Sequence, residues 1–568
     1  MKIIGANILK QTIECETLPA NNKLQVSRLP FSGIPPQSRL FTEYLRDPVS
    51  LKNFYPNAIE KPTQIASFIS TVLADYTTDR GELCDALAEI NSNIGAGKKT
   101  NENIRLLRDV DTVAVVTGQQ AGLFTGPLYT VYKALSAVKM AEMLNKNGSK
   151  AVPVFWTATE DHDFDEVSEA YFIGKAGNVF RSAYLPDGYV MDSPVGSVTI
   201  DSEINHLIGE IFEELPETEF SGELKNLLHH TWSPGTRFGD AFEKTLALIL
   251  GRFGIIFIDP MNERIKRLCG PIYINAIQKT DEIAAAVIGR SRELERGGFH
   301  AQVLVEEDYF PLFWHDDAGR RKALRKAGDG VYRVKGDMRE FSLSELAGIA
   351  ATEPQRFSPG VMLRPVVQDY LLPAVCYFGG GAEIAYFAQN SEVYRVLDRP
   401  VTPVFHRQSF TIIESKHRRV FEKLDLDFSQ LFDGVEGTML RLAEERLSPD
   451  TSRLFAEVEE RINTELNRLD ENVSPIDPTL AEYLTKRRRK MLYHIAALKK
   501  KTLLARTRQD ETLSRQIDNL FTALLPKGQL QERHLNVFSF LNKFGLNFID
   551  WIYESIDLDD KTHRIVEL

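Results

Sequence analysis

Long apolar runs and paired cysteines are the features that this sequence lacks most clearly. No window approaches the roughly eighteen consecutive apolar residues of a membrane-spanning helix, and Met1–Gln11 contains no uninterrupted apolar segment of the kind that an export signal needs. The spacing of the cysteines suggests neither a disulfide framework nor a zinc knuckle, since no two of them are close together: Cys15, Cys84, Cys269 and Cys376. We therefore expect a soluble cytoplasmic protein with reduced thiols.

An excess of basic residues is also missing. The formal net charge is -11 and the pI is about 5.6, whereas a protein that neutralises nucleic-acid phosphates needs a basic surface. The run Lys486–Lys490 lies in a predicted long helix, where a charge run is usually a solvated face. We expect a small-molecule substrate, with no nucleic-acid or membrane partner. The 568 residues, 43% of them hydrophobic, predict a large core and more than one structural unit.

The middle of the sequence alternates between strand and helix patterns. Val113–Thr117, Ala151–Thr157 and Gly254–Asp259 are short runs of apolar and β-branched residues, and helical spacing of apolar residues follows or precedes them in Tyr129–Leu144 and Phe242–Leu250. Strands that are apolar on both faces are typical of parallel sheets covered by helices. The predicted fold class is therefore α/β.

Two stretches depart from this alternation and are interpreted as insertions. Residues 170–235 contain short turn-rich segments, and residues 305–350 alternate strand-like pieces with charged turns. Both would interrupt the sheet without replacing it. We assign residues 1–407 to one catalytic core that includes the two insertions.

Residues 408–525 predict a helical arm. Apolar side chains recur at intervals of three or four residues from Leu454 to Leu469. After a proline turn, a second stripe steps by four and three residues in strict alternation, as in the seam of a coiled coil: Leu484, Arg488, Met491, Ile495, Leu498, Thr502 and Ala505. An arm too thin to bury these stripes alone predicts a homodimer. Residues 526–568 are apolar and aromatic again, and we expect them to pack back on the core.

A glycine-rich turn follows the first predicted strand. Gly118, Gly122 and Gly126 precede an amphipathic helix, an arrangement in which backbone amides and the helix N-terminus can face an anion. Their spacing matches neither the dinucleotide fingerprint nor a Walker A loop, so a purely structural turn remains an alternative. The side chains of this segment favour the ligand-binding alternative, and we expect substrate contacts from Thr117, Gln119, Gln120, Tyr129 and Lys133.

An acidic cluster follows the second predicted strand. Glu160–Glu166 holds five carboxylates and one imidazole, and the carboxyl ends of neighbouring parallel strands meet at the same crevice. Such groups can hold an ammonium group, bind a divalent cation or transfer protons. We expect catalytic roles for Glu160, His162 and Asp163 and substrate contacts from Trp156 and Asp161. The alternative is an acidic helix N-terminus stabilised by the helix dipole.

Two further segments combine polar residues with apolar surroundings. In Gly297–Val303, His300 could serve as a ligand or general base, with Gln302 beside it, although a lone histidine is more often a hydrogen-bonded core residue. In Ser358–Gln389, charged and polar groups are costly to bury unless they are paired or face a ligand. We expect substrate contacts from Arg364, Gln368, Asp369, Glu383 and Tyr386, and anion-binding amides from Gly379 and Gly380. Buried ion pairs that only hold the fold are the alternative.

Four motifs, taken in order, resemble one family: TGQQAGLFTGPLYTVYK, FWTATEDHDFDEV, GFHAQV and LRPVVQDYLLPAVCYFGGGAEIAYFAQ. They are similar to the cysteine ligases of bacillithiol biosynthesis, and Gly528–Arg533 extends the likeness toward the end of the chain. The resemblance implies a Rossmann-like core related to nucleotidyltransferases and class I synthetases, two connecting insertions, and a coiled-coil domain through which two subunits dimerise. It also implies addition of L-cysteine to glucosaminyl-malate.

The chemistry implied by this resemblance needs an activated carboxylate, which ATP would supply by adenylation or phosphorylation. In that scheme the glycine turn and Lys133 cradle phosphate or carboxylate oxygens, and the acidic cluster receives ammonium groups. His162 or His300 takes the amine proton, and Arg364 binds a malate carboxylate. ATP or ADP is the expected cofactor, and no metal is predicted. A metal-dependent hydrolase and a coiled-coil scaffold without catalysis are the alternatives.

Overall fold

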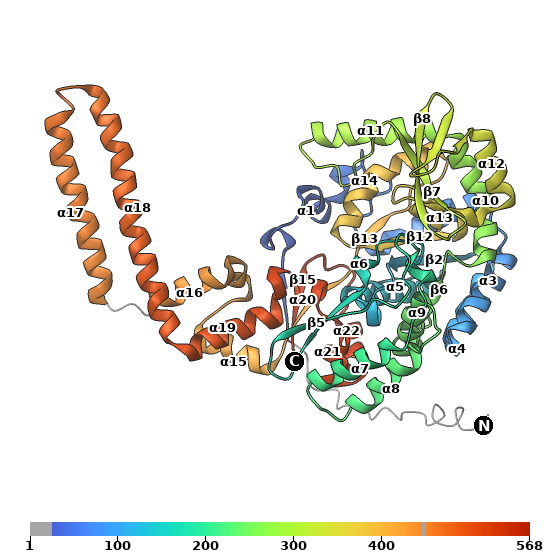
Figure 1. Cartoon of the computed structure of the whole chain (residues 1–568), viewed down its shortest axis with the longest axis horizontal. Helices are drawn as coiled ribbons and strands as arrows, with labels where there is room; N and C mark the ends of the chain where they lie inside the picture. Colours follow the sequence, from blue (N-terminus) through green and yellow to red (C-terminus); the bar gives the residue numbers. More distant parts are fainter. Residues whose placement is uncertain (1–24, 446–448) are drawn as a thin grey trace.

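The computed structural model describes residues 25–445 and 449–568. At its centre is a five-stranded parallel sheet in the order β13-β12-β2-β3-β6 (Figure 1). The strands are β2 (Thr112–Gln119), β3 (Lys150–Thr157), β6 (Ile256–Ile258), β12 (Ala374–Gly379) and β13 (Val404–His406). Three of them coincide with the apolar runs of the sequence, and the predicted α/β class is confirmed.

The order of strands reverses between β2 and β12. From β2 the chain proceeds outward through β3 to β6, and it later returns to the opposite side of β2 to form β12 and then β13. In open α/β sheets, ligands bind outside the carboxyl ends of the strands at such a switch point. The sequence did not reveal β12, because its short apolar run passes directly into three glycines.

Alternate residues of β2 enter two different cores. Val113 and Val115 pack with apolar residues of α5 (Tyr129–Lys146), whereas Ala114 and Val116 belong to the main core on the other face. Burial on both faces explains why this strand is apolar throughout. The other helices around the sheet are α1 (Arg39–Arg46), α2 (Ile69–Asp75), α3 (Arg80–Asn93), α4 (Lys98–Leu107), α9 (Phe238–Ile249), α10 (Glu263–Gln278), α11 (Thr280–Arg296), α12 (Leu343–Thr352), α13 (Arg364–Leu371) and α14 (Gly381–Val396).

Both predicted insertions are present. The first contains the antiparallel pair β4 (Glu169–Ile173) and β5 (Val179–Ala183), followed by α7 (Glu203–Glu214) and α8 (Ser221–Thr231). The second forms an antiparallel sheet in the order β10-β9-β8-β7-β11. Its strands are β7 (Tyr309–His315), β8 (Arg321–Gly328), β9 (Val331–Val334), β10 (Glu340–Phe341) and β11 (Phe357–Pro359).

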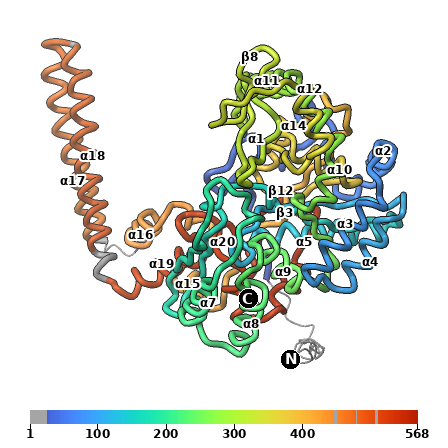
Figure 2. Tube along the Cα trace, turned by 45° about the vertical axis from the view of Figure 1, so that its right-hand side comes forward, coloured from blue at the N-terminus to red at the C-terminus, as the bar shows by residue number. Residues whose placement is uncertain are grey.

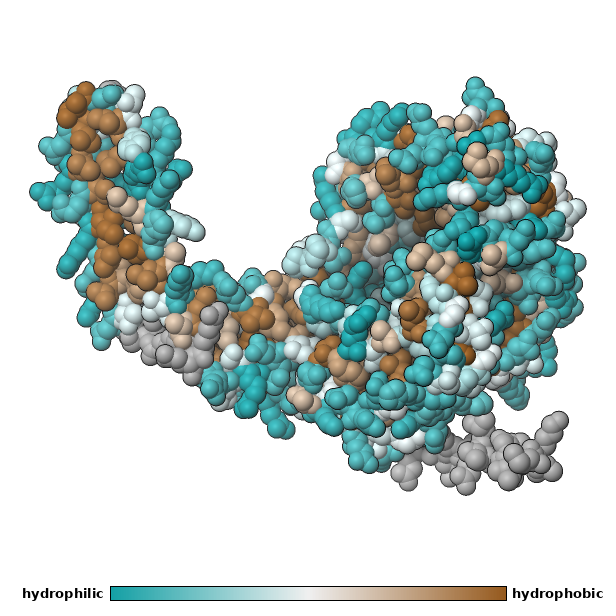
Figure 3. Space-filling model, in the orientation of Figure 1, coloured by the Kyte–Doolittle hydropathy of each residue, from teal (hydrophilic) through white to brown (hydrophobic). Residues whose placement is uncertain are grey.

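The arm projects from the rest of the molecule as a helical hairpin (Figures 1 and 2). It consists of α17 (Pro449–Val473) and α18 (Pro478–Gln509), and each helix contains one of the two predicted stripes. Leu466 is buried in the hairpin, whereas Leu454, Met491 and Leu498 are about half exposed. The space-filling view shows apolar surface along the arm (Figure 3). The predicted coiled-coil hairpin is confirmed, and one chain does not bury its stripes.

The segment after the arm returns to the body. From α19 (Glu511–Leu524) the chain passes through α20 (Gln531–His534), α21 (Phe538–Phe544) and α22 (Asn547–Glu554) to β15 (His563–Glu567), which pairs with β1 (Gln25–Leu29) and β14 (Ser409–Ile413). Two further helices, α15 (Ser415–Leu424) and α16 (Gly434–Glu445), lie near the root of the arm (Figure 1).

Three cysteines, Cys84, Cys269 and Cys376, are free and buried. Cys15 and the segment Met1–Gln11 lie outside the described residues. Within the part of the chain that the structure describes, no helix combines the length and hydropathy that crossing a membrane requires.

Candidate functional site

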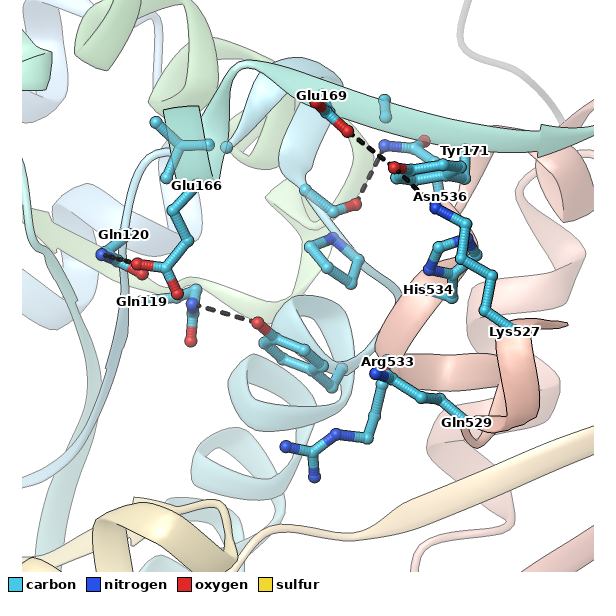
Figure 4. Close-up of a pocket in the computed structure, with 16 residues that line it drawn as sticks. Gln119, Gln120, Glu166, Glu169, Tyr171, Lys527, Gln529, Arg533, His534 and Asn536 are labelled. Carbon is cyan, nitrogen blue, oxygen red and sulfur yellow. Dashed lines mark hydrogen bonds between the residues drawn. The ribbon is translucent and has the colours of Figure 1, made fainter. Parts of the chain in front are cut away.

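A cavity of about 370 Å³ lies between the glycine turn and the segment that follows the arm (Figure 4). One wall comes from the end of β2 and the turn after it, and a second comes from α6 (Phe164–Val167) and β4. The third comes from residues 527–536. The predicted site residues that line this cavity are Gln119, Gln120, Gly122, Gly126 and Tyr129.

Close packing explains two of the glycines. A Cβ on Gly118 would lie 2.6 Å from the carbonyl oxygen of Trp156 on the adjacent strand, and one on Gly122 would lie 2.8 Å from the Cα of Gly126. At these positions the chain itself, rather than a ligand, takes the space that a side chain would need. The structural alternative therefore accounts for Gly118 and Gly122, although Gly122 also borders the cavity.

The turn is held in a strained conformation by Asn536. Phe124 and Thr125 have φ angles of 49° and 80°, which non-glycine residues adopt at a cost. The Asn536 side-chain amide donates hydrogen bonds of 2.7 Å to the Phe124 carbonyl and 2.9 Å to the Gly126 carbonyl. These bonds compensate for the strain and join the glycine turn to the segment after the arm.

The polar wall of the cavity is organised by Gln120. Its amide nitrogen donates to Asp161 Oδ2 at 2.7 Å and to Glu166 Oε2 at 3.0 Å. Both amide hydrogens are thus used, and the carbonyl oxygen of Gln120 remains as an acceptor. Glu169, farther along this wall, already accepts from the Tyr171 hydroxyl and is ion-paired with Arg181.

The opposite wall is basic. Lys527 donates to the Tyr171 hydroxyl at 3.0 Å and lies over the same ring, and the His534 ring packs against it at a tilt of 32° with a centroid distance of 3.8 Å. Burial lowers the pKa of His534 to about 4, so its imidazole is neutral at pH 7. Among the described residues, no carboxylate lies within 4 Å of the charged groups of Lys527 or Arg533. Two cations are therefore available on this wall.

A second group of predicted residues forms a closed network at the switch point. Lys133 donates to the Gly118 carbonyl and to Gln119 Oε1, each at 2.9 Å, and is ion-paired with Glu383. The Glu383 carboxylate also accepts from the Tyr377 hydroxyl at 2.6 Å and from the Gly380 amide at 2.7 Å. Burial opposes its ionisation, but Lys133 and Gly380 outweigh this and keep the pKa of Glu383 below its usual value.

The hydrogen-bond capacity of this network is largely used. Lys133 has three acceptors for its three ammonium hydrogens, and the Gly380 amide faces Glu383 rather than an external anion. A Cβ on Gly379 would lie 2.9 Å from the Glu383 Cβ, so packing explains that glycine as well. A ligand would have to displace one of these internal contacts to bind Lys133.

Arg364 belongs to the same region but not to the cavity lining. Its guanidinium lies over the Tyr377 ring, 5.5 Å from the centroid, and donates to Gln368 Oε1 at 3.0 Å. Burial opposes the charged form of Arg364, but Tyr377 and Tyr386 outweigh burial and raise the pKa of the guanidinium. Gln368 in turn donates to Asp369, which accepts from Tyr394 and is buried. Since α13 ends just before β12 begins, Asp369 lies near the amino end of that strand, away from the cavity.

The acidic cluster after β3 is divided among several partners. Glu160 is buried in an ion pair with Lys266 of α10, and burial raises the pKa of this carboxyl. Asp161 is half-buried, and its contacts with His162, Arg321 and Gln120 outweigh burial and lower its pKa. Asp163 is exposed and accepts a hydrogen bond from the Glu166 amide at the N-terminus of α6. The capping alternative therefore describes the observed geometry of Asp163.

The remaining predicted residues are scattered. Thr117 and Trp156 are buried within the sheet, where the Thr117 hydroxyl donates to the Phe378 carbonyl. His300 is exposed in the loop after α11. Gln302 lines a separate cavity of about 290 Å³, which shares Gln529 and Arg533 with the first cavity.

Several residues of the site were not identified from the sequence: Lys266, Arg321, Lys527, Gln529, Arg533, His534 and Asn536. The only available signal was the segment Gly528–Arg533, which the family resemblance included without assigning it a role. Within residues 25–445 and 449–568, no group of three or more histidine, cysteine or carboxylate side chains could hold a metal ion.

Comparison with known proteins matches the whole described chain to one family. Residues 24–408 match the model "Bacillithiol biosynthesis BshC, N-terminal Rossmann-like domain", and residues 410–568 match "Bacillithiol biosynthesis BshC, C-terminal coiled-coil domain". Three relatives each bear the name "Putative cysteine ligase BshC". The relative from Salinibacter ruber is 33% identical and covers 97% of this chain and 100% of its own length. The relative from Koribacter versatilis is 33% identical and covers 95% of this chain and 99% of its own length. The relative from Solibacter usitatus is 34% identical and covers 94% of this chain and 98% of its own length.

Proposed function

Because the chain belongs to the bacillithiol biosynthesis BshC family, we propose that it is a ligase that forms an amide between the carboxyl group of L-cysteine and the amine of glucosaminyl-malate. The observation that carries this proposal is that hydrogen-bond acceptors, the Gln120 carbonyl and the Glu166 carboxylate, lie on one wall of the cavity and two cations, Lys527 and Arg533, on the other (Figure 4). Glucosaminyl-malate has a matching separation between its amine and its two carboxylates.

The cavity gives each end of this substrate suitable partners. The Gln120 carbonyl oxygen and the Glu166 carboxylate can accept hydrogen bonds from an amine or ammonium group. Lys527 and Arg533 can pair with the malate carboxylates, and a guanidinium suits bidentate contact. This assigns malate recognition to Lys527 and Arg533 in place of Arg364, whose guanidinium already contacts Gln368, Tyr377 and Tyr386.

Amide formation requires activation because a free carboxylate is a poor electrophile. We propose that ATP supplies it: a cysteine carboxylate oxygen attacks a phosphorus atom, the phosphoanhydride bond breaks, and an acyl phosphate or acyl adenylate results. The amine nitrogen then attacks the acyl carbon, the phosphate-bearing oxygen leaves, and one amine proton is released. Arg533 borders both cavities and has no carboxylate partner within the part of the chain that the structure describes, so its charge fits phosphate oxygens as well as carboxylates.

The half-exposed stripe on the arm supports a homodimer that forms through α17 and α18. Met491 and Leu498 are 48% and 55% exposed, and burying apolar surface of this extent against a second copy would be favourable. Light scattering should give twice the chain mass for the parent protein. Replacing both residues with glutamate should yield monomers, whereas replacing the exposed Lys486 and Lys490 with glutamate should leave the dimer.

The activity can be tested directly with cysteine, glucosaminyl-malate and ATP in a cytoplasm-like reducing buffer. Mass spectrometry should show the cysteinyl amide accumulating together with ADP or AMP in equal amounts. The amide without nucleotide turnover would refute activation by ATP. A purified protein that binds neither substrate and forms no amide would refute the ligase function.

A further inference from the structure

Three separate parts of the chain meet at Arg321. This residue begins β8 in the second insertion, and its backbone amide donates to the Asp192 carbonyl of the first insertion at 2.8 Å. Its side chain reaches the segment after β3, where Nη1 lies 3.1 Å from His162 Nδ1 and 3.5 Å from Asp161 Oδ1. Arg321 thereby joins both insertions to the acidic cluster.

The guanidinium of Arg321 is fixed by contacts that do not involve His162. It lies over the Phe313 ring, 3.8 Å from the centroid, while Nε donates to Ser358 Oγ and Nη2 donates to the Pro359 carbonyl, each at 3.0 Å. The side chain is only 9% exposed. Nε and Nη2 of Arg321 are thus used in hydrogen bonds, and the plane of the guanidinium packs on Phe313. Nη1 is therefore the nitrogen that faces His162.

This geometry determines which ring nitrogen of His162 carries the proton. A guanidinium has five N–H donors and no acceptor, so a hydrogen bond of 3.1 Å between Arg321 Nη1 and His162 Nδ1 requires Nδ1 to accept. In a neutral imidazole the other nitrogen then bears the hydrogen. His162 is 32% exposed, and among the described residues its Nε2 has no hydrogen-bond partner, so this N–H is available to a ligand.

The other charged or titratable groups around His162 do not reverse this assignment. Asp161 Oδ1 is 3.6 Å from Nδ1, beyond hydrogen-bond distance, and already accepts from the His162 backbone amide at 2.8 Å. Asp192 is ion-paired with Lys322. His315, on β7, is neutral because burial lowers its pKa to about 3, and its Nε2 contacts Ser358 Oγ at 2.8 Å.

We propose that Arg321 is a positioning residue that holds His162 as the neutral Nε2–H tautomer, so that His162 donates a hydrogen bond to substrate oxygen and does not take the amine proton. The assignment of the tautomer stands on the geometry alone, whereas the role toward substrate rests on the proposed ligase function. An Nε2–H donor suits an oxygen that gains negative charge as the amine attacks the acyl carbon.

The amine proton must then pass to another group. Glu166 is the carboxylate suited to this role, because it borders the cavity and, among the described residues, its carboxylate oxygens accept a hydrogen bond from Gln120 alone (Figure 4). Glu169 also borders the cavity, but its carboxylate is committed to Tyr171 and Arg181. The proposal therefore assigns the amine proton to Glu166 on the cavity wall.

The tautomer can be measured without substrate. In protein labelled with ¹⁵N-histidine, the resonances that disappear in His162→Gln identify His162, and at pH 7.5 their shifts and couplings should show hydrogen on Nε2 and none on Nδ1. Arg321→Met, which keeps an apolar side chain over Phe313 but removes the donors, should give a mixture of tautomers. A parent protein with hydrogen on Nδ1, or an unchanged pattern in Arg321→Met, would overturn the assignment.

The role toward substrate is tested by comparing two replacements of His162. Glutamine places an N–H donor close to the position of Nε2, so His162→Gln should retain kcat within about fivefold, whereas His162→Ala should lose roughly 100-fold, as expected for loss of one such donor. Equal losses in the two variants, with unchanged melting temperatures, would overturn the donor role. If the parent protein forms no amide at all, the ligase function fails while the NMR result still decides the tautomer.

Discussion

The charged groups around the glycine turn fall into two regions that differ in how completely they are paired. Glu160 with Lys266 and Glu383 with Lys133 form enclosed pairs, and Lys133 has an acceptor for every ammonium hydrogen. On the cavity walls, Glu166, Lys527 and Arg533 keep most of their capacity. Residues of the first kind hold β2, β3 and β12 in place, and residues of the second kind keep charge and hydrogen-bonding capacity that a ligand could use.

This difference separates two roles that look alike in the sequence. A buried charge that loses its partner destabilises the fold strongly, whereas a charge on a cavity wall can be removed at little cost to stability. Substitutions in the enclosed pairs should therefore lower stability, and substitutions on the walls should lower activity at constant stability.

The largest effect is expected for Lys266→Met. The substitution leaves Glu160 buried without its cation, and breaking a buried ion pair in this way costs about 3–5 kcal/mol. Denaturant unfolding should show this loss. Lys98→Met is the matched control, because the Lys98–Glu102 pair is exposed and should contribute less than about 1 kcal/mol. Comparable values for the two variants would contradict the enclosed role of the Glu160 pair.

On the open wall, Arg533→Met should lower kcat/KM for glucosaminyl-malate by roughly 10- to 100-fold, the range expected when a charge-assisted hydrogen bond is lost. The melting temperature should change little, since Arg533 is exposed and unpaired with any carboxylate among the described residues. Arg105→Met, on the exposed face of α4, is the control. An Arg533 variant with full activity would remove this side chain from substrate recognition.

Asn536 fixes the glycine turn through hydrogen bonds to its carbonyls. Asn536→Ala should destabilise the protein by about 1–3 kcal/mol, because the Phe124 and Gly126 carbonyls lose their buried donor. It should also raise KM, since the turn forms one cavity wall. Asn519→Ala on α19, which is exposed, should be neutral in both urea unfolding and steady-state kinetics.

A smaller, pH-dependent effect is expected from His563, which is buried between Ser409 and Thr411. Burial lowers its pKa to about 4 from an unfolded value near 6.5. Between these values the unfolded chain binds a proton that the folded protein does not, so the free energy of unfolding should fall as pH drops from about 6.5 to 4. His563 should contribute up to about 1.4 kcal/mol per pH unit to the slope of the free energy of unfolding against pH. His563→Gln should reduce the measured slope by that amount; an unchanged slope would show that His563 is not the source.

The sequence predicted the elements whose pattern is local. The apolar runs of β2, β3 and β6, the two insertions and the heptad-like stripes of the arm each depend on residues close together in the chain, and each was found. The strand β12 was missed because six residues leading into glycines do not distinguish a strand from a turn.

The candidate site was predicted on one side only. Gln119, Gln120 and Tyr129 follow a recognisable strand and turn, so their position at the carboxyl edge of the sheet could be inferred. Lys527 and Arg533 reach the same cavity because the segment after the arm packs against the body. No local sequence pattern predicts this packing. The sequence also did not indicate which carboxylates form ion pairs. Glu160 and Glu166 lie six residues apart, yet Glu160 is buried in a pair with Lys266 and Glu166 faces the cavity.

The bond between Asn536 and the turn has a consequence for how the protein is made. Leu123 and Asn536, which also contact each other through the Leu123 carbonyl, are 413 residues apart. At a synthesis rate of about 5–20 residues per second, Asn536 is added at least some 20 seconds after the turn that contains the left-handed Phe124 and Thr125. A ribosome-bound chain that ends before residue 536 therefore has the central strands but an unsupported cavity wall. Ligand binding by chains of increasing length should begin only once this residue has left the ribosome.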